Sequence, residues 1–289
     1  MLADAAYGKS QIRLVQVRRG GGDRHTLEDL TVAVRFKGDF EASYSAGDNS
    51  DVLPTDTMKN TVYALASAQP VGEPEGFGLR LARHFLDRNP RLTQVRVDLT
   101  RHAWRRAAIG GRDHGHTFIK CGPDVRTSTV QAGRDGTMIG AGVADLVILK
   151  SAHSAFAGFP RDEYTTLPEA TDRILATSLT ATWHYEDTEL EFGSLWQLTR
   201  QTLLEVFAEH DSQSVQHTLH AMGEAVLERV AEISAIRLVM PNKHHLPIDL
   251  SRFGLENRNE IFVATEEPYG LIEATLARDM RGSPGASGA

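Results

Sequence analysis

The stretch that decides the fold runs from Leu179 to Met240 and reads LTATWHYEDTELEFGSLWQLTRQTLLEVFAEHDSQSVQHTLHAMGEAVLERVAEISAIRLVM. Its first residues, 179–185, alternate between apolar and polar side chains, as a half-buried strand does. Apolar residues then recur at helical spacing in two segments, which start at about Ser194 and about Ser214. A further strand is expected over 236–240. The stretch therefore predicts a strand, two consecutive helices and a returning strand.

The inward faces of these two helices follow from the same spacing. In the first helix the side chains expected to face inward are Leu195, Leu198, Leu203 and Phe207. In the second helix they are Leu219, Met222, Val226 and Val230. Each helix is thus expected to bury one apolar stripe.

The first half of the chain shows the same order of elements without obvious repetition of the sequence. Period-two alternation predicts strands over 12–17, 32–36 and 95–99. A helix that Thr55 or Asp56 can cap follows the first two of these strands, and a second helical pattern ends near Asp87. Both halves therefore read as strands, two helices and strands.

Antiparallel strands with paired helices on one face define an α+β fold class. We expect one unit over residues 1–135 and a second over 136–280, joined within the glycine-rich stretch 133–142, and a disordered tail over 281–289. The uncovered face of such a sheet must be buried elsewhere, and association between copies of the chain is the obvious way.

Composition excludes several classes of protein. The chain has 289 residues, a formal charge of −7 and a single cysteine, Cys121. One cysteine allows no internal disulfide framework, which fits a reducing compartment. No run of about 18 apolar residues predicts a membrane span, and the N-terminus does not resemble a secretory signal. The acidic balance disfavours nucleic acid as a partner, so a cytoplasmic protein without nucleic-acid or membrane partners is expected.

Four separated segments carry a resemblance to a known family. They are Tyr7–Ser10 (YGKS), Asp48–Tyr63 (DNSDVLPTDTMKNTVY), Ser151–Arg173 (SAHSAFAGFPRDEYTTLPEATDR) and Met240–Leu250 (MPNKHHLPIDL). Together they resemble urate oxidases (uricases). The resemblance implies two tandem units of the tunnelling fold that assemble into β-barrels, and a homotetramer with active sites between subunits. The ending is not the peroxisomal Ser-Lys-Leu signal of eukaryotic members, which favours the bacterial, cytosolic type.

The resemblance also implies which residues would hold a planar, anionic purine. Phe156 would stack on the ring, and Arg173 would donate two hydrogen bonds to a carbonyl and a ring nitrogen. The backbone N–H of Val215 and the side-chain amide of Gln216 would bind the opposite purine edge. Leu167 would form part of the pocket wall. A planar guanidinium suits such an edge better than an ammonium does, and an amide both donates and accepts.

A proton relay is implied by three further residues that lie far apart in the sequence. Lys9, Thr55 and His244 match the lysine, threonine and histidine of that relay. A hydroxyl donates and accepts at once, and an imidazole titrates near neutral pH, so these groups suit proton transfer. Asn242 would hold O2, and later water, above the ring. Asp56 would contact substrate through its backbone from a neighbouring subunit.

Each residue taken singly has a simpler interpretation. Lys9 can be an ordinary surface charge, Thr55 a helix cap and His244 a surface residue at a strand end. Arg173 can form an ion pair with Glu169, four residues earlier on a helix. The functional reading therefore depends on these residues occurring together.

Cofactor motifs are absent from the sequence: there is no GxGxxG, CxxCH or GxxxxGK[ST]. The resemblance implies oxidation of urate by O2 to 5-hydroxyisourate and hydrogen peroxide in purine degradation, with no cofactor and no metal. A metal-dependent purine or pterin enzyme of the same fold is the alternative. Its ligands would come from Asp113-His114-Gly115-His116, which reads as an exposed loop, or from the pair His217 and His220. A non-catalytic, barrel-forming binding protein is the third possibility.

Overall fold

The computed structural model describes residues 2–20 and 22–278 of the chain. The expected tail over 281–289 lies outside these residues. The chain divides into two compact units. Unit 1 comprises Met1–Asp145 and His184–Trp196, and unit 2 comprises Leu146–Trp183 and Gln197–Ala289. Helices and antiparallel strands occur in both units, which confirms the predicted α+β class.

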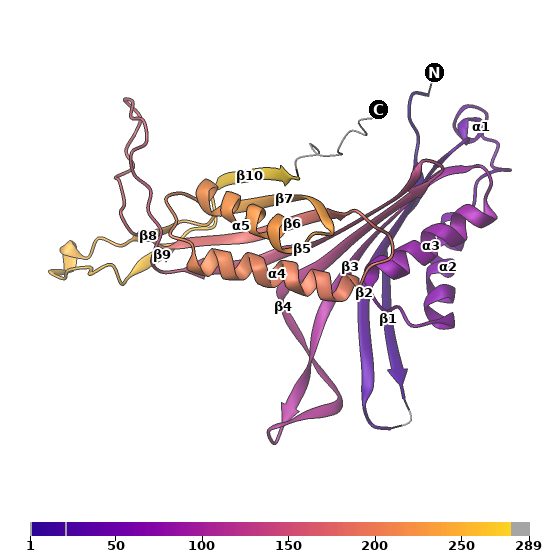
Figure 1. Ribbon diagram of the computed structural model, residues 1–289, viewed down its shortest axis with the longest axis horizontal. Coiled ribbons are helices and arrows are strands. Elements are labelled where there is room, and N and C mark those ends of the chain that lie inside the picture. Colours follow the sequence, from indigo (N-terminus) through magenta and orange to yellow (C-terminus); the bar gives the residue numbers. More distant parts are fainter. Residues whose placement is uncertain (1, 21, 279–289) are drawn as a thin grey trace, which may run out of the picture. The chain divides into compact units, whose positions relative to one another are not determined.

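Unit 1 is an antiparallel sheet with helices packed on it (Figure 1). Its elements are β1 (Tyr7–Arg19), β2 (His25–Gly38), α1 (Glu41–Ser45), α2 (Thr55–Ala68), α3 (Pro74–Arg88), β3 (Leu92–Ile109), β4 (Arg112–Gly133) and the first part of β5 (Gly136–Lys150). The strands follow the order β1-β2-β3-β4-β5, and each neighbouring pair is antiparallel. Strand β1 therefore lies at an edge of the sheet.

The core of unit 1 lies between the sheet and helices α2 and α3. Val34 on β2 and Val97 on β3 are opposite each other in the register, and both are buried. Helix α3 approaches β3 and β4 closely at Gly78, where a Cβ atom would lie 2.8 Å from Val130 Cγ2 and 2.9 Å from Leu99 Cδ1. A larger residue at Gly78 would push the helix off the sheet.

Unit 2 repeats this arrangement. Its elements are the end of β5, β6 (Leu175–Tyr185, of which the last two residues belong to unit 1), α4 (Phe192–Glu209, from Gln197 on), α5 (Val215–Arg229), β7 (Ile233–Asn242), β8 (His245–Pro247), a 3-10 turn (Ser251–Phe253), β9 (Phe262–Ala264) and β10 (Gly270–Ala277). The strand order is β5-β6-β7-β10, and β8 pairs with β9 separately. Helix α5 packs on β7 and β10, and a Cβ atom at Gly223 would lie 2.7 Å from Leu276 Cδ1.

Three local predictions were wrong. Leu198 is 43% exposed, because α4 turns Thr199 and Thr202 inward instead. The segment 113–116 is part of strand β4 and not a loop. Thr55 is the first residue of α2, which follows Pro54, and no side chain caps that helix end. Proline fits there because the first helical N–H groups have no intrahelical acceptor.

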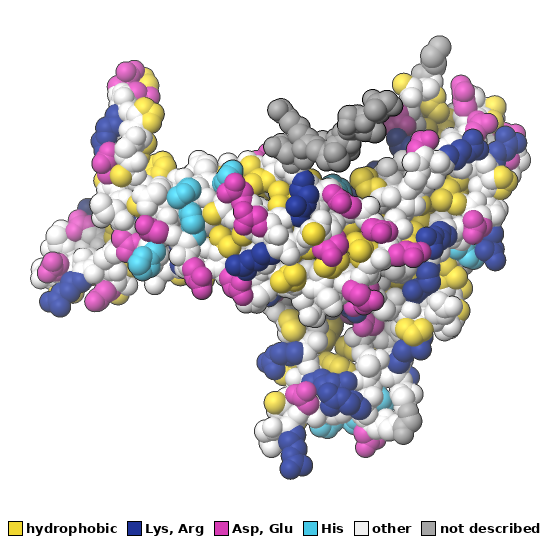
Figure 2. Space-filling model, viewed as in Figure 1, with side chains coloured by type: hydrophobic (Ala, Val, Ile, Leu, Met, Phe, Trp, Pro, Cys, Tyr) yellow, Lys and Arg dark blue, Asp and Glu magenta, His cyan; other side chains and the backbone are white. Residues whose placement is uncertain are grey.

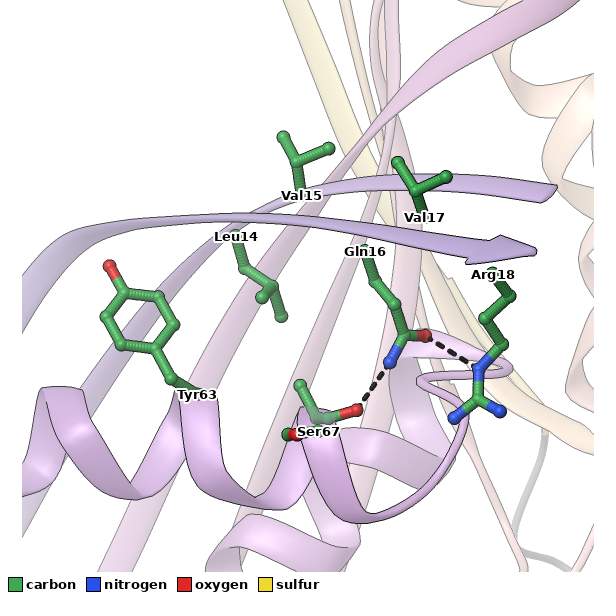
Figure 3. Close-up of a pocket in the computed structure, with 8 residues that line it drawn as sticks. Leu14, Val15, Gln16, Val17, Arg18, Tyr63 and Ser67 are labelled. Carbon is green, nitrogen blue, oxygen red and sulfur yellow. Dashed lines mark hydrogen bonds between the residues drawn. The ribbon is translucent and has the colours of Figure 1, made fainter. Parts of the chain in front are cut away.

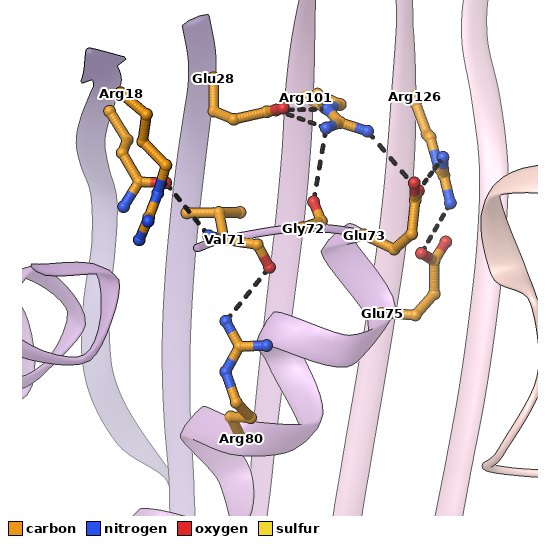
Figure 4. A network of polar contacts seen from close by, with 10 residues as sticks. Arg18, Glu28, Val71, Gly72, Glu73, Glu75, Arg80, Arg101 and Arg126 are labelled. Atoms are coloured by element: carbon orange, nitrogen blue, oxygen red, sulfur yellow. Dashed lines mark hydrogen bonds and ion pairs between the residues drawn. The ribbon is translucent and has the colours of Figure 1, made fainter. Parts of the chain in front are cut away.

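A network of ion pairs fixes the start of α3 on the sheet of unit 1 (Figure 4). Arg101 contacts Glu28 and Glu73, while Arg126 contacts Glu73 at 2.6 Å and Glu75 at 2.7 Å. The side chain of Glu75 is fully buried. Burial raises the pKa of Glu75, and the charge of Arg126 opposes that shift. The pair is therefore a buried charge contact within the core.

Charged side chains are distributed unevenly over unit 1. Figure 2 shows Lys and Arg gathered where the ends of β3 and β4 project. These strands carry Arg105, Arg106, Arg112 and Lys120. The negative net charge of the chain therefore coexists with a local basic region. No helix of the described part of the chain is long and apolar enough to cross a membrane.

Candidate active site

The segment 153–173 folds back on itself and places two of the predicted binding residues together. Phe156 and Ala170 exchange both backbone hydrogen bonds, at 2.8 and 2.9 Å. The backbone N–H of Arg173 donates to Ser154 O at 2.7 Å, and the N–H of Ser154 donates to Asp172 Oδ1 at 3.1 Å. These bonds hold Arg173 beside the segment that carries Phe156.

A cavity of about 220 Å³ opens at this place in unit 2. Its walls come from the 153–173 segment, the end of β7 and the β8–β9 region. The lining residues are Phe156, Leu167, Pro168, Ala170, Asp172, Arg173, Ile174, Asn242, His244, His245, Leu246, Pro247, Asn259 and Phe262. Five predicted site residues, Phe156, Leu167, Arg173, Asn242 and His244, therefore line one cavity.

The guanidinium of Arg173 lies against the aromatic ring of Phe156. Its central carbon is 5.1 Å from the ring centroid, within cation–π range. Burial lowers the pKa of Arg173, and its buried Nε has no hydrogen-bond partner among the described residues. A buried N–H donor without a partner is costly, and a ligand acceptor would relieve that cost. Arg173 thus has donor capacity available at the cavity.

The alternative ion pair between Arg173 and Glu169 does not form. The described residues 160–174 contain no helix, and Glu169 Oε1 accepts from the N–H of Gly158 at 3.2 Å instead. The helical spacing on which that alternative depended is therefore wrong.

Phe156 is not a core phenylalanine. It is partly exposed and lines the cavity, while its ring stacks on Phe159 with centroids 4.9 Å apart and planes 16° apart. Neighbouring rings stiffen the aromatic wall. Such a wall suits a flat ring ligand.

The residues immediately before α5 lie beside the segment that carries Phe156. Ser212 accepts from the N–H of Ala155 at 2.7 Å and donates its own N–H to His153 O at 3.0 Å. Ser214 then caps α5 by accepting from the N–H of His217 at 3.1 Å. The preceding N–H groups, those of Val215 and Gln216, belong to the helix start, where backbone donors lack intrahelical acceptors.

The two predicted residues at this helix start differ in exposure. Val215 is buried and Gln216 is exposed. Neither lines the cavity. Their predicted contacts with the purine edge therefore remain a prediction.

The end of β7 presents Asn242 and His244 to the cavity. Asn242 is buried, with 9% of its surface exposed. The backbone around it is fixed, because Lys243 N–H donates to Ala176 O at 2.9 Å and Thr265 N–H donates to His244 O at 2.9 Å. These bonds to two other segments leave both side chains available at the cavity wall.

The remaining predicted residues belong to unit 1. Lys9 lies on β1 opposite Val34, and the register shifts between Lys9 and Ile12. This bulge keeps Lys9 on the buried face of the sheet, because Ile12 pairs with the buried Val32 on the same face of β2. Lys9 therefore faces the side that α2 covers.

Asp56 lies within electrostatic reach of Lys9. Its carboxylate accepts from Lys59 and from Asn60, the latter at 3.0 Å. These contacts lower the pKa of Asp56, with Lys59 as the main cause and the charge of Lys9 adding to it. Thr55 precedes Asp56 at the start of α2. The structure thus brings Lys9 and the start of α2 together.

A larger groove in unit 1 contains none of the predicted site residues. It has a volume of about 430 Å³ and lies between β1 and α2 (Figure 3). Its walls are Leu14, Val15, Gln16, Val17, Arg18, Tyr63, Ala66 and Ser67. The residues that line this groove carry no carboxylate and no imidazole group.

Of the histidines named for a metal site, His114 and His116 have ring centroids 4.5 Å apart, whereas His217 and His220 have other partners. The ring of His217 is 4.3 Å from that of His210, and His220 pairs with Glu224 at 3.1 Å. Within residues 2–20 and 22–278, no three His, Cys, Asp or Glu side chains form a group that could hold a metal ion.

Several cavity residues were not predicted from the sequence. Asp172 precedes Arg173 directly, so its position next to a predicted residue was a usable signal. Phe262 is the first residue of β9, and Asn259 lies in the loop before it. The sequence around them has no pattern that indicates a site. The pairing of β8 with β9 and the bond from Ile248 N–H to Ile261 O hold this segment at the cavity.

The fold and the cavity together define an α+β protein with a site suited to a small planar ring that carries oxygen acceptors. Known proteins agree with this class. The family model of uricases matches residues 5–131 and 139–273. The uricase of Arthrobacter globiformis is 44% identical over 96% of this chain and 90% of its own length, and that of Dictyostelium discoideum is 36% identical over 96% and 97%.

A solved structure gives the same result. The crystal structure of uricase from Arthrobacter globiformis superposes with a TM-score of 0.93 at 43% identity, covering 98% of this chain and 96% of that one. The chain therefore belongs to the uricase family, and its activity is the oxidation of urate.

Proposed function

We propose that this chain oxidises urate with O2 and water to 5-hydroxyisourate and hydrogen peroxide, without a cofactor, in purine degradation in the cytoplasm. The observation that carries the proposal is the buried, unpartnered Nε of Arg173 beside Phe156 in the cavity. Urate offers carbonyl oxygens and ring nitrogens on the edge of a flat ring, which match a guanidinium and an aromatic face.

Substrate binding uses groups of unit 2 in this proposal. Phe156 stacks on the purine, Arg173 donates to one edge, and Leu167 closes the wall. The backbone N–H of Val215 and the amide of Gln216 bind the opposite edge. The hydrogen bonds that join Ser212, just before α5, to the segment of Phe156 support this assignment.

Oxygen activation and proton transfer use the remaining groups. Asn242 holds O2, and afterwards water, above the ring. Lys9, Thr55 and His244 form the proton relay that removes a proton from bound urate and later orients the attacking water. Doubly deprotonated urate is then the reductant, so that two electrons pass from the ring to O2.

We further propose that the site is completed at a subunit interface of a homotetramer. The cavity is lined by residues of unit 2, whereas Lys9, Thr55 and Asp56 belong to unit 1. Within the part of the chain that the structure describes, β1 and β10 each have a neighbouring strand on one side only, and an edge of this kind can pair with another chain. Copies joined in this way would form the β-barrels of the tunnelling fold.

Urate turnover by protein dialysed against a strong chelator tests the proposal. The chelated protein should still consume urate, measured by its absorbance near 290 nm, and should consume O2 and release peroxide at the same time, because no step requires a metal. Turnover that returns only when zinc or another metal is added would instead support a metal-dependent enzyme. A protein that binds urate without consuming O2 would support the non-catalytic alternative.

A further inference from the structure

Tyr7 touches both parts of the proposed relay region in unit 1. Its hydroxyl accepts a hydrogen bond from the backbone N–H of Leu53 at 3.0 Å. Leu53 is two residues before Thr55, and Tyr7 is two residues before Lys9 on β1. Alternate residues of a strand share a face, so the side chains of Tyr7 and Lys9 point to the same side. One side chain therefore connects the strand that carries Lys9 to the segment that carries Thr55.

The ring of Tyr7 is held in place by two phenylalanines. It meets Phe40 edge to face at 4.9 Å between centroids and Phe36 at 5.7 Å. Burial raises the pKa of the Tyr7 hydroxyl, so the group stays neutral and its oxygen remains a hydrogen-bond acceptor at neutral pH. A side chain fixed by packing can hold the hydroxyl at a defined position.

The backbone between Tyr7 and Lys9 leaves little freedom. A Cβ atom at Gly8 would lie 2.0 Å from the carbonyl oxygen of Val34, so β1 is pressed against β2 at this residue. After Lys9 the strand bulges, and Gln11 adopts a φ of 58°. The position of Lys9 is thus set by the strand pairing before it and by the bulge after it.

The segment before Thr55 has fewer constraints of its own. Pro54 occupies the N-cap position of α2, has no N–H, and makes no side-chain capping bond. The bond from Leu53 N–H to Tyr7 therefore anchors this segment immediately before the helix begins. Loss of that anchor would remove the hydrogen bond that joins the residues immediately before α2 to β1.

We propose that Tyr7 is a positioning residue that holds the start of α2, and with it Thr55, in place beside Lys9. The inference depends on the proposed relay of Lys9 and Thr55. Tyr7 acts through these residues and has no contact with substrate in this proposal. Small displacements of a catalytic group reduce turnover strongly, so one hydroxyl at this place is expected to have a measurable effect.

Tyr7→Phe tests this role, and Tyr63→Phe is its matched control. Tyr63, which lies on α2 (Figure 3), donates its hydroxyl to Arg13 O on β1 at 3.2 Å, so it joins β1 to the helix itself and not to the segment before Thr55. Tyr7→Phe keeps the ring packing and should lower kcat about tenfold while KM changes by less than about twofold. Tyr63→Phe should retain wild-type kcat. Equal losses of kcat in both variants would show a general loosening of α2 and would overturn the assignment.

Combination with Thr55→Ala separates this inference from the function on which it rests. If Tyr7 acts through Thr55, then Tyr7→Phe should cause no further loss of kcat in the Thr55→Ala background. A further loss of about the same factor would overturn the positioning role. Near wild-type turnover of Thr55→Ala alone would reject the relay itself. Full loss in Thr55→Ala with no loss in Tyr7→Phe would reject only the role of Tyr7.

Discussion

The cavity of unit 2 and the β1–α2 region of unit 1 are built in different ways. The cavity walls are mostly irregular segments and strand ends, joined by hydrogen bonds such as those between Phe156 and Ala170. Lys9 and Thr55 instead lie within a strand and at the first turn of a helix, on a packed sheet. The first region encloses a volume with a free donor, whereas the second presents titratable and hydroxyl groups on a rigid frame.

This difference suggests that the two regions have different roles, substrate recognition and proton transfer. Irregular segments can wrap around the outline of a ligand, so they suit recognition. Groups on regular elements keep their positions more accurately, so they suit proton transfer. Variants of the binding residues Phe156 and Arg173 should therefore change KM, whereas variants of the β1–α2 region should change kcat.

The largest effect is expected from Thr55→Ala, which would remove the central hydroxyl of the proposed relay. We expect kcat to fall by about 10²- to 10⁴-fold, the usual contribution of acid–base groups, with assembly and Tm nearly unchanged. Lys9→Ala should behave similarly. The control is Thr57→Ala, an exposed threonine of the same helix. Near wild-type kcat for Thr55→Ala, measured from urate absorbance, would remove the β1–α2 region from the chemistry.

The next largest effect is expected from mixing two variants, which tests whether the cavity and the β1–α2 region of one active site come from different chains. Thr55→Ala and Arg173→Ala chains should each be nearly inactive. Co-expressed in equal amounts, they should recover about a quarter of wild-type activity, because about half of the two-fold pairs would be mixed and half of the sites in a mixed pair would combine an intact cavity with an intact relay. Mixing the purified variants without subunit exchange is the control. No recovery in assemblies shown by mass spectrometry to be mixed would place both regions in the same chain.

Arg173→Lys is expected to have a smaller effect, confined to binding. An ammonium keeps the charge but cannot donate two parallel hydrogen bonds, so KM should rise about 10- to 100-fold. Arg161→Lys is the matched control, since Arg161 lies over Phe159 at 5.4 Å in the same segment but does not line the cavity. An unchanged KM for Arg173→Lys would show that the unpartnered donor does not bind urate.

The smallest effect is expected from Glu75→Gln, which should change the pH dependence of the stability of unit 1. Because burial raises the pKa of Glu75 in the folded state, folding favours the protonated form. The resulting stabilisation is present below the ordinary pKa range of glutamate and is lost as the pH rises through the raised pKa. Glu75→Gln should lack this pH dependence, and Tm should shift by about 2–4 °C for each kcal/mol involved.

Glu205→Gln in unit 2 provides the control of opposite sign. Hydrogen bonds from Gln201 and Arg229 lower the pKa of the exposed Glu205. Its contribution would therefore be present above the ordinary glutamate range and lost as the pH falls. Differential scanning calorimetry between acid and neutral pH measures both variants. The same pH slope for Glu75→Gln and the wild type would show that Glu75 does not titrate in that range.

The sequence predicted the regular elements well where a single periodicity dominated. Helix α5 buries Leu219, Met222 and Val226 as predicted. Helix α4 was less predictable, because it exposes Leu198 and buries two threonines. Tertiary packing, and not the apolar pattern, decided which side chains of α4 are buried. The hydrophobic periodicity alone cannot predict that a helix buries polar residues in place of an apolar one. The short strands of the β8–β9 pair likewise have little periodic signal.

The candidate site was predicted residue by residue, but its arrangement was not. The sequence named Phe156 and Arg173 from a matching segment, yet it suggested a helical ion pair between Arg173 and Glu169. The observed hairpin-like pairing removes that option, because the bond from Arg173 to Ser154 joins residues 19 apart in the sequence. Asn259 and Phe262 could not be found in advance for the same reason.

By itself, the sequence determined the α+β class, most helices and strands, and the identities of the chemical groups. These properties depend on local spacing and on residue type, which a linear pattern contains. Tertiary structure alone decided that five predicted residues line one cavity, that Lys9 faces α2, and that Tyr7 reaches the segment before Thr55. Those outcomes depend on hydrogen bonds and packing between distant segments, whose register local sequence does not specify.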